Sequence, residues 1–149
     1  MRIVINDKYG GFGLSHDAIM RYAELKSIKL YAWVDDIAKR IYGENIKVED
    51  AVLVHYATVP QKEYESIVER EREKPIAPGR FEKSNALYFS DRDIKRNDPL
   101  LIQVIKELKQ EANGHCAKLK IINIPENVDW EVKEYDGWEH IAEKHRTWS

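Results

Sequence analysis

The sequence has one cysteine and no long apolar run, and each shortage excludes a class of structure. With Cys116 alone, no intramolecular disulfide can form, which is typical of proteins of a reducing compartment. No apolar stretch approaches the roughly 20 residues that cross a membrane as a helix. No signal peptide precedes the first expected strand. We therefore expect a cytoplasmic protein that does not use a membrane.

The sequence also lacks an excess of positive charge. Its 24 basic and 26 acidic residues give a formal net charge of −2. Broad binding to DNA or RNA polymers needs a clear basic excess, so such partners are not expected. A pocket for one small anion remains open, because two or three arginines suffice for it.

The length of 149 residues and the hydrophobic content of 43% are typical of one globular domain, here 1–149. Within it, 34–84 is a mixed, polar middle part. Its last segment, 75–84, contains two prolines and a glycine, and we expect a mobile loop there that could carry Phe81 towards a ligand.

Glycine is scarce, yet three of the seven glycines lie within four positions, after an apolar strand pattern at 3–5 and before a helix pattern that begins near Ser15. A strand, a glycine-rich turn and a helix N-terminus can form a cradle for a phosphate. The spacing matches neither a P-loop nor the dinucleotide fingerprint, and tight packing alone would also explain the glycines. The candidate ligand-binding residues of this turn are Tyr9, Gly10, Gly11, Phe12, Gly13 and Ser15, with Tyr9 and Phe12 available to stack on a base.

Hydrophobic periodicity predicts alternating strands and helices. The expected strands are 2–6, 29–33, 51–56, 86–90, 118–124 and 130–135, and the expected helices are 16–26, one from Pro60, one from Pro99 with Asp98 as its N-cap, and one from about Gly137. This order predicts an α/β (α+β) single-domain layered sandwich, with helices packed on a mixed sheet of about five strands. A central first strand would place the glycine turn at a carboxyl end, where ligands bind in open sheets.

Cations in two further segments could meet an anion. Arg92 and Arg96 lie in a charged loop before the helix at Pro99, and His145 and Arg146 lie near the end of the sequence. Each group has a structural explanation as well: loop charges can simply be solvated, and His145 falls on an apolar helical stripe with Trp138.

The residues suggest neither a catalytic set nor a metal or cofactor site. Asp91 and Asp93 have no third metal ligand at a fixed spacing, and His140 and His145 are too far apart for the zinc motif of two histidines on one helical turn. His55 lies in an expected strand without a convincing partner. We therefore expect no enzyme activity and no cofactor.

Several segments together resemble a family of small bacteriophage proteins. The similarity covers about 2–25 and 85–148, and is carried by RIVINDKYGGFGLS at 2–15, NDP at 97–99, the helix end at 107–114, Pro125 with VDWE at 128–131, YDG at 135–137 and EKHRTW at 143–148. This family is associated with anti-CBASS sponges, which sequester bacterial immune nucleotide signals. The resemblance implies a binder of a cyclic dinucleotide, such as cyclic GMP-AMP, that holds its ligand without cleaving it in the host bacterial cytoplasm.

Two alternatives stay open beside the sponge. One is a nucleotide-processing enzyme that uses His16 or His145 as acid or base, with Asp17 or Asp91 as partner. The other is a phage protein that binds a host protein. A ligand with two-fold symmetry would suit a homodimer or higher oligomer, which we also expect.

Overall fold

The computed structural model describes residues 1–74 and 83–144. It has a mixed α+β fold, which confirms the predicted fold class. The chain divides into two compact units: unit 1 consists of Met1–Lys26 and the chain from Asp91 onward, and unit 2 of Ser27–Ser90. The sequence predicted one domain for 1–149, and this division by itself does not decide that point. Most of the expected loop 75–84 lies outside the described residues.

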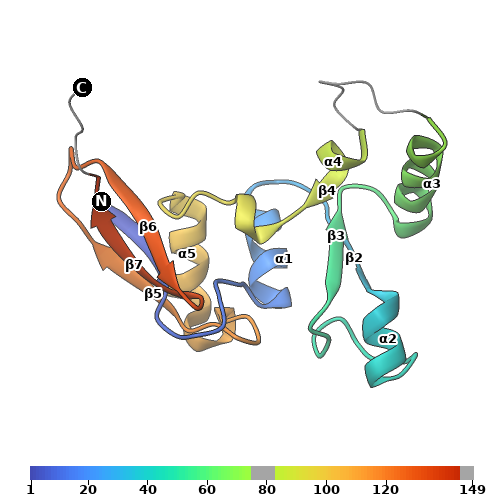
Figure 1. Cartoon of the computed structure of the whole chain (residues 1–149), viewed down its shortest axis with the longest axis horizontal. Helices are drawn as coiled ribbons and strands as arrows, with labels where there is room; N and C mark the ends of the chain where they lie inside the picture. The colour runs from blue at the N-terminus through green and yellow to red at the C-terminus, as the bar shows by residue number, and fades with distance from the viewer. Residues whose placement is uncertain (75–82, 145–149) are drawn as a thin grey trace. The chain divides into compact units, whose positions relative to one another are not determined.

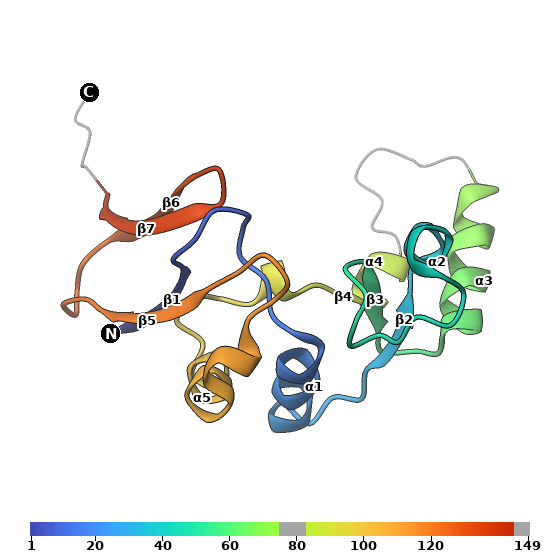
Figure 2. The same ribbon diagram turned by 90° about the horizontal axis from the view of Figure 1, so that it is seen from below.

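Unit 1 is built in three layers (Figures 1 and 2). Strands β1 (Arg2–Asn6) and β5 (Leu119–Asn123) form an antiparallel pair in the middle layer. Helices α1 (His16–Leu25) and α5 (Pro99–Leu108) cover one face of this pair, and the hairpin of β6 (Trp130–Tyr135) and β7 (Trp138–Glu143) lies on the other. Successive residues of β1 are buried on both of its faces, and they form the core of unit 1 together with the apolar stripes of α1 and α5.

The helix starts follow the predicted capping chemistry. The Ser15 hydroxyl accepts a hydrogen bond from the backbone N–H of Ala18 and caps α1. Asp98 caps α5 through the Leu100 N–H, with Pro99 in the first turn as predicted. The second carboxylate oxygen of Asp98 accepts a hydrogen bond from the buried Tyr22 hydroxyl at 2.6 Å, which ties α1 to the start of α5. The short 3-10 helix η2 (Lys109–Ala112) continues α5.

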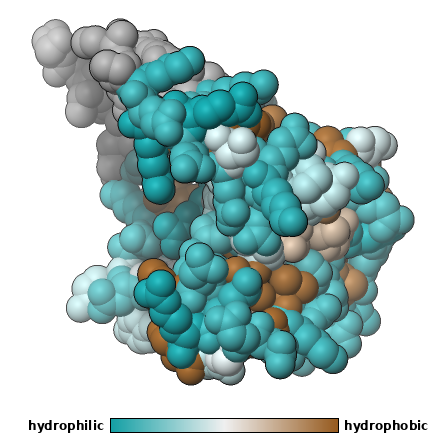
Figure 3. All heavy atoms as spheres, turned by 90° about the vertical axis from the view of Figure 1, so that its right-hand side faces the viewer, coloured by the Kyte–Doolittle hydropathy of each residue, from teal (hydrophilic) through white to brown (hydrophobic). Residues whose placement is uncertain are grey.

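Unit 2 is a three-stranded antiparallel sheet in the order β2 (Tyr31–Val34), β3 (Val54–Ala57) and β4 (Tyr88–Phe89). Its helices are α2 (Asp36–Tyr42), α3 (Gln61–Arg72) and α4 (Lys83–Leu87). A small apolar core forms beside α2 from Val34, Ala38 and Ala51. Figure 3 shows apolar side chains gathered on part of the protein surface. In α2, Ile37 and Ile41 are more than half exposed.

The predicted helix from Gly137 is wrong, because this segment is strand β7. Asp136 and Gly137 have φ values of 47° and 84°, and Tyr135 pairs with Trp138 across the two-residue loop. An Asp-Gly pair with positive φ at both residues is the hairpin turn that matches the twist of two antiparallel strands. The apolar spacing after Trp138 fits a helical stripe only by coincidence, and the Asp136-Gly137 pair is the stronger indication of structure here.

The single mixed sheet of about five strands is also wrong. The strands form separate sheets of two, three and two strands, and every pairing is antiparallel. β1 therefore does not lie at the centre of an open parallel sheet, and the argument for a ligand site at its carboxyl end does not apply. Residues 86–90 divide between α4 and the short β4, the 51–56 strand is shifted to 54–57, and the polar part after Val34 contains α2.

No helix in 1–74 or 83–144 is both long and apolar enough to cross a membrane.

Candidate functional site

The glycine turn after β1 is bound to the chain's own acceptors. The Gly10 N–H donates to the Asp136 carbonyl at 2.9 Å, and the Ser15 N–H donates to the Ala112 carbonyl at 2.9 Å. The Leu14 N–H donates to a carboxylate oxygen of Asp91, also at 2.9 Å. An internal carboxylate thus takes one of the positions that the sequence suggested for a phosphate.

The glycines of this region allow backbones to approach closely. Gly10 and Gly11 have φ values of 117° and 105°, which L side chains rarely adopt. A Cβ atom on Gly137 of the hairpin would lie 2.1 Å from the Gly11 nitrogen, and one on Gly114 would lie 2.8 Å from the Gly13 carbonyl carbon and oxygen. The packing explanation of the glycine cluster is therefore sufficient for these positions.

A buried ion pair closes the inner side of the turn. Arg96 forms two hydrogen bonds with the Glu139 carboxylate, at 2.5 and 2.8 Å, and Glu139 is only 6% exposed. The Arg96 guanidinium lies 3.6 Å from the centre of the Phe12 ring. Glu139 also accepts the backbone N–H of Asn6, whose own side chain bridges to Lys118 and Gly137. Phe12 and Arg96, both predicted to meet a ligand, are thus engaged inside the protein.

Tyr9, which was predicted to stack on a base, lies on the outside of the same turn. The centre of its ring lies 4.9 Å from that of Trp138 and 6.4 Å from that of Tyr135, and both pairs are edge-to-face. All three side chains are exposed. The Trp138 indole N–H donates to Asp7 at 3.0 Å. These rings form a small aromatic surface that could stack with a planar molecule.

The remaining predicted residues do not gather at the turn. Ser15 is used as a helix cap and also donates to the Glu111 carbonyl, while Arg92 is exposed in the 3-10 helix η1 (Asp91–Asp93). Phe81, His145 and Arg146 lie outside the described residues. No group of three His, Cys, Asp or Glu side chains in the described part of the chain could hold a metal ion.

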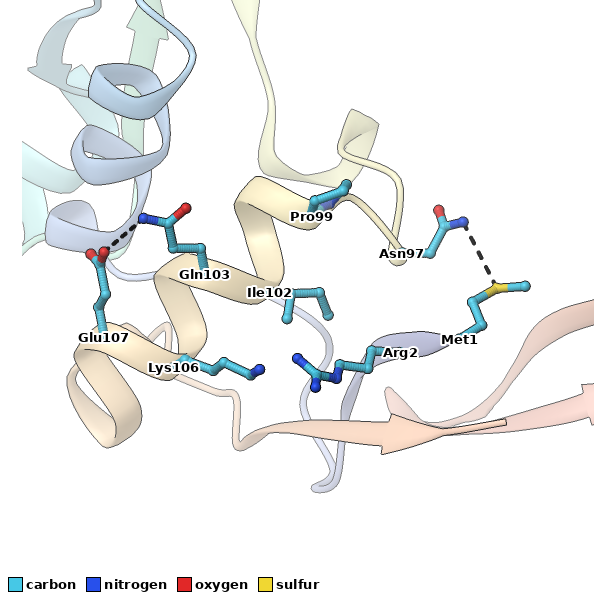
Figure 4. Close-up of a pocket in the computed structure, with 8 residues that line it drawn as sticks. All are labelled: Met1, Arg2, Asn97, Pro99, Ile102, Gln103, Lys106 and Glu107. Carbon is cyan, nitrogen blue, oxygen red and sulfur yellow. Dashed lines mark hydrogen bonds between the residues drawn. The ribbon is translucent and has the colours of Figure 1, made fainter. Parts of the chain in front are cut away.

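A groove between the start of β1 and α5 has the composition expected of a ligand site (Figure 4). Its volume is about 570 Å³, within the range of roughly 300–1,000 Å³ typical of small-molecule pockets. The apolar parts of its wall come from Met1, Pro99 and Ile102. The polar side chains that line it are those of Arg2, Asn97, Gln103 and Lys106, together with Glu107.

Two cations face each other across this groove. Figure 4 shows the Lys106 ammonium and the Arg2 guanidinium pointing towards one another from α5 and β1. Neither side chain forms a hydrogen bond or ion pair with any residue that the structure describes. Like charges that approach each other without an intervening carboxylate make a site favourable for an anion.

The one carboxylate of the groove is already neutralised. Glu107 accepts hydrogen bonds from Arg21 at 2.8 and 3.2 Å and from Gln103 at 2.9 Å. These bonds, with that from Arg21 the largest cause, lower the pKa of Glu107 from 4.5 to about 2, and the same pair raises the pKa of Arg21. Glu107 therefore stays ionised at neutral pH and is paired with a cation that faces it, so it does not cancel the charge of Arg2 and Lys106.

The sequence analysis missed the groove residues. Arg2 lies in the predicted first strand and Lys106 in the helix predicted from Pro99, and neither was among the predicted site residues. Their juxtaposition depends on how β1 packs on α5, and no local spacing in the sequence signals it. The helix itself and its Asp98 cap were predicted correctly.

The chain matches no protein-family model, and neither curated proteins nor solved structures gave a significant match. The chemistry of the sites and the resemblance of the sequence motifs therefore carry the functional proposal.

Proposed function

We propose that this chain is a phage anti-defence protein that binds and sequesters a bacterial immune nucleotide signal without cleaving it. The observation that carries the proposal is the pair of unpartnered cations, Arg2 and Lys106, that face each other across the apolar-walled groove between β1 and α5. The ligand class is a cyclic dinucleotide such as cyclic GMP-AMP, and the place of action is the cytoplasm of the host bacterium.

The groove offers a complementary group for each part of a nucleotide. Arg2 and Lys106 suit phosphodiester oxygens, and a hydrogen bond to a charged group contributes about 1.5–3 kcal/mol. Pro99 and Ile102 provide apolar wall for a base or a sugar. The amide nitrogens of Asn97 and Gln103 already donate to Met1 and Glu107, but their carbonyl oxygens can accept hydrogen bonds from a base edge. Since the ligand needs only to be held, two cations, two amides and an apolar wall are sufficient.

Binding is tested with a thermal-shift panel of cyclic dinucleotides, cyclic trinucleotides and linear dinucleotides against the purified protein. A ligand present at about 100 times its Kd adds about 2.7 kcal/mol of stability, which raises Tm measurably. The bound compound is then released by heat and analysed by mass spectrometry. A sponge returns the nucleotide unchanged, whereas a nucleotide-processing enzyme returns product.

Charge-removing variants place the site. Lys106→Gln and Arg2→Gln should each weaken the binding of the best ligand by about 10- to 150-fold, the equivalent of one charge-assisted hydrogen bond. Lys133→Gln is the matched control, because Lys133 lies on β6 and does not line the groove. Equal affinity in all three variants would reject the groove. A panel without any hit would reject nucleotide binding and favour a host-protein partner.

The proposal includes a homodimer or higher assembly. A cyclic dinucleotide with two equivalent halves suits two copies of one surface related by a two-fold axis. Light scattering of the protein with and without the best ligand tests this point: a mass of one chain in both conditions would contradict it.

A further inference from the structure

A chain of hydrogen bonds in unit 2 joins a carboxylate, an imidazole and a phenol. The carboxylate belongs to Asp35, at the end of β2, the imidazole to His55 on β3, and the phenol to Tyr88 on β4. The His55 Nε2 atom lies 2.5 Å from an Asp35 carboxylate oxygen, and the Nδ1 atom lies 2.9 Å from the Tyr88 hydroxyl. The sequence analysis had found no partner for His55, and the cross-strand packing supplies two.

The contact between His55 and Asp35 determines the direction of the hydrogen bond between His55 and Tyr88. One oxygen of Asp35 accepts the backbone N–H of Ile37, the other faces His55, and these contacts, with His55 the largest cause, lower the pKa of Asp35. An ionised carboxylate can only accept, so the proton of the neutral His55 ring must be on Nε2. The Nδ1 atom then carries a lone pair, and the Tyr88 hydroxyl donates to it.

Aromatic side chains surround this relay. Trp33 lies 5.8 Å from His55 and 5.6 Å from Tyr64, and Tyr64 lies 5.9 Å from Tyr88, all between ring centres. The rings of His55 and Tyr88 are also in contact, with 5.8 Å between their centres, so that each of the four rings contacts two of the others. The side chains of His55 and Asp35 are 34% and 25% exposed, and Tyr88 is half-buried, so solvent reaches the relay. A flat aromatic group could pack on these rings beside the Tyr88 hydroxyl.

We propose that Asp35, His55 and Tyr88 form a nucleophilic site, in which the Tyr88 oxygen accepts an acyl or phosphoryl group from an activated ester with an aromatic leaving group. Nucleophile, base and orienting carboxylate are linked in series as in a catalytic triad, but here the carboxylate meets Nε2 and the nucleophile meets Nδ1. This activity is separate from the nucleotide binding proposed for unit 1.

The step balances without any further reactant. The Tyr88 hydroxyl proton moves to His55 Nδ1 as the phenol oxygen bonds to the carbonyl carbon or phosphorus. The bond from that atom to the leaving oxygen breaks, and the leaving group departs with the bonding electron pair. The imidazolium then gives the proton to the leaving group or to water, while Asp35 remains ionised and acts as a positioning residue.

The test uses p-nitrophenyl acetate for acyl transfer and bis(p-nitrophenyl) phosphate for phosphoryl transfer. Both are offered to the full chain carrying Cys116→Ser, because the exposed thiol would react on its own. We expect a burst of one nitrophenolate per chain with at least one ester, and peptide mass mapping should locate the added group on Tyr88. Which ester reacts identifies the transferred group.

Variants separate a transfer site from a structural hydrogen-bond network. Tyr88→Phe should abolish the burst, whereas Tyr42→Phe, which removes a more exposed phenol in the same unit, should keep it. Asp35→Asn keeps an acceptor for the Ile37 N–H but reverses the His55 tautomer, so that Nδ1–H points at Tyr88. The burst rate should then fall by about 100-fold or more, as for a lost general base.

Two results would overturn the proposal. One is the absence of a burst with both esters in the protein with its relay intact. The other is labelling of Tyr42 or Tyr135 at the same rate as Tyr88, since these exposed phenols have no such relay. Either would leave the three residues as a tie between β3 and the start of α2. Because mapping is done on the chain with an unchanged relay, a Tyr88→Phe variant that fails to fold does not affect this decision.

Discussion

The glycine turn and the β1–α5 groove both belong to unit 1, and both have donors that could bind an anion. The donors of the turn are already hydrogen-bonded within the protein, whereas the cations of the groove are not. In the turn, N–H groups that could cradle a phosphate donate to Asp91 and to backbone carbonyls. In the groove, Arg2 and Lys106 have no partner among the residues that the structure describes. A donor is useful to a ligand only when the protein itself has not satisfied it.

The same difference separates stability from binding. The turn is connected to a buried network through Asn6, Glu139 and Arg96, so changes there should mostly alter folding. The groove cations Arg2 and Lys106 are exposed and unpaired among the described residues, so changes to them should mostly alter affinity. Three measurements follow this contrast, from the largest expected effect to the smallest.

The largest effect is expected for Glu139→Ala beneath the turn. Loss of the carboxylate leaves the largely buried Arg96 without its counter-charge and the Asn6 N–H without an acceptor. Removal of one partner of a buried ion pair costs about 3–5 kcal/mol in the free energy of unfolding. Chemical denaturation measures it, with Glu131→Ala on the exposed side of the hairpin as control, where we expect less than about 1 kcal/mol. Similar losses in both variants would contradict the proposed role of the network.

Asp91→Ala should leave the turn with an unsatisfied N–H donor that can bind an anion, as the cations of the groove can. The Leu14 N–H loses its acceptor, and leaving a part-buried donor unsatisfied costs about 1–3 kcal/mol in the free energy of unfolding. The vacated position can then accept an anion. We expect inorganic phosphate to raise Tm of the variant more than that of the wild-type protein in calorimetry at equal ionic strength. If phosphate stabilises both proteins equally, the turn is not blocked by Asp91.

The smallest effect concerns Glu107 on the groove wall. Its pKa in the folded protein is about 2 instead of 4.5, so the carboxylate stabilises the fold above pH 4.5, and this contribution is lost as the pH falls towards 2. Glu107→Gln should therefore flatten the decrease in unfolding free energy over this range while affinity for the nucleotide at neutral pH is kept.

Arg21→Gln provides the matched test, because Arg21 is the largest cause of the lowered pKa of Glu107. It should reduce the decrease in unfolding free energy between pH 4.5 and 2 in the same way as Glu107→Gln. The double variant should show the same pH dependence as either single variant. Independent, additive effects of the two substitutions would show that the pair does not produce the pH dependence.

Several elements of the fold could be predicted because their signals are local. Ser15 and Asp98 cap the helices that follow them, and the apolar pattern at 3–5 indicated the strand at 2–6. The final segment could not be read from apolar spacing alone, since Trp138, Ile141 and Ala142 fit a helix as well as a strand. The Asp136-Gly137 turn decides between them, through two successive residues with positive φ.

The candidate sites were less predictable than the fold. The glycine cluster was a correct signal of unusual backbone geometry, but the groups that accept from its N–H atoms lie 77 or more residues farther along the chain. The groove brings Arg2 close to Lys106, and the relay joins β3 and β4 to the N-cap residue of α2. Contacts between residues far apart in the sequence leave no spacing pattern.

The sequence by itself determined the caps, most of the strands and helices, the mixed α+β class and the flexible backbone of the turn. These depend on the conformational preferences and hydrogen-bonding groups of adjacent residues. Only the tertiary structure decided that Asp91 accepts a hydrogen bond from the Leu14 N–H of the turn and that Glu139 neutralises Arg96. It also decided that Arg2 and Lys106 face each other without a carboxylate between them. The physical reason is that electrostatic pairing depends on distance in space, and the packing of β1, α5 and the hairpin sets those distances.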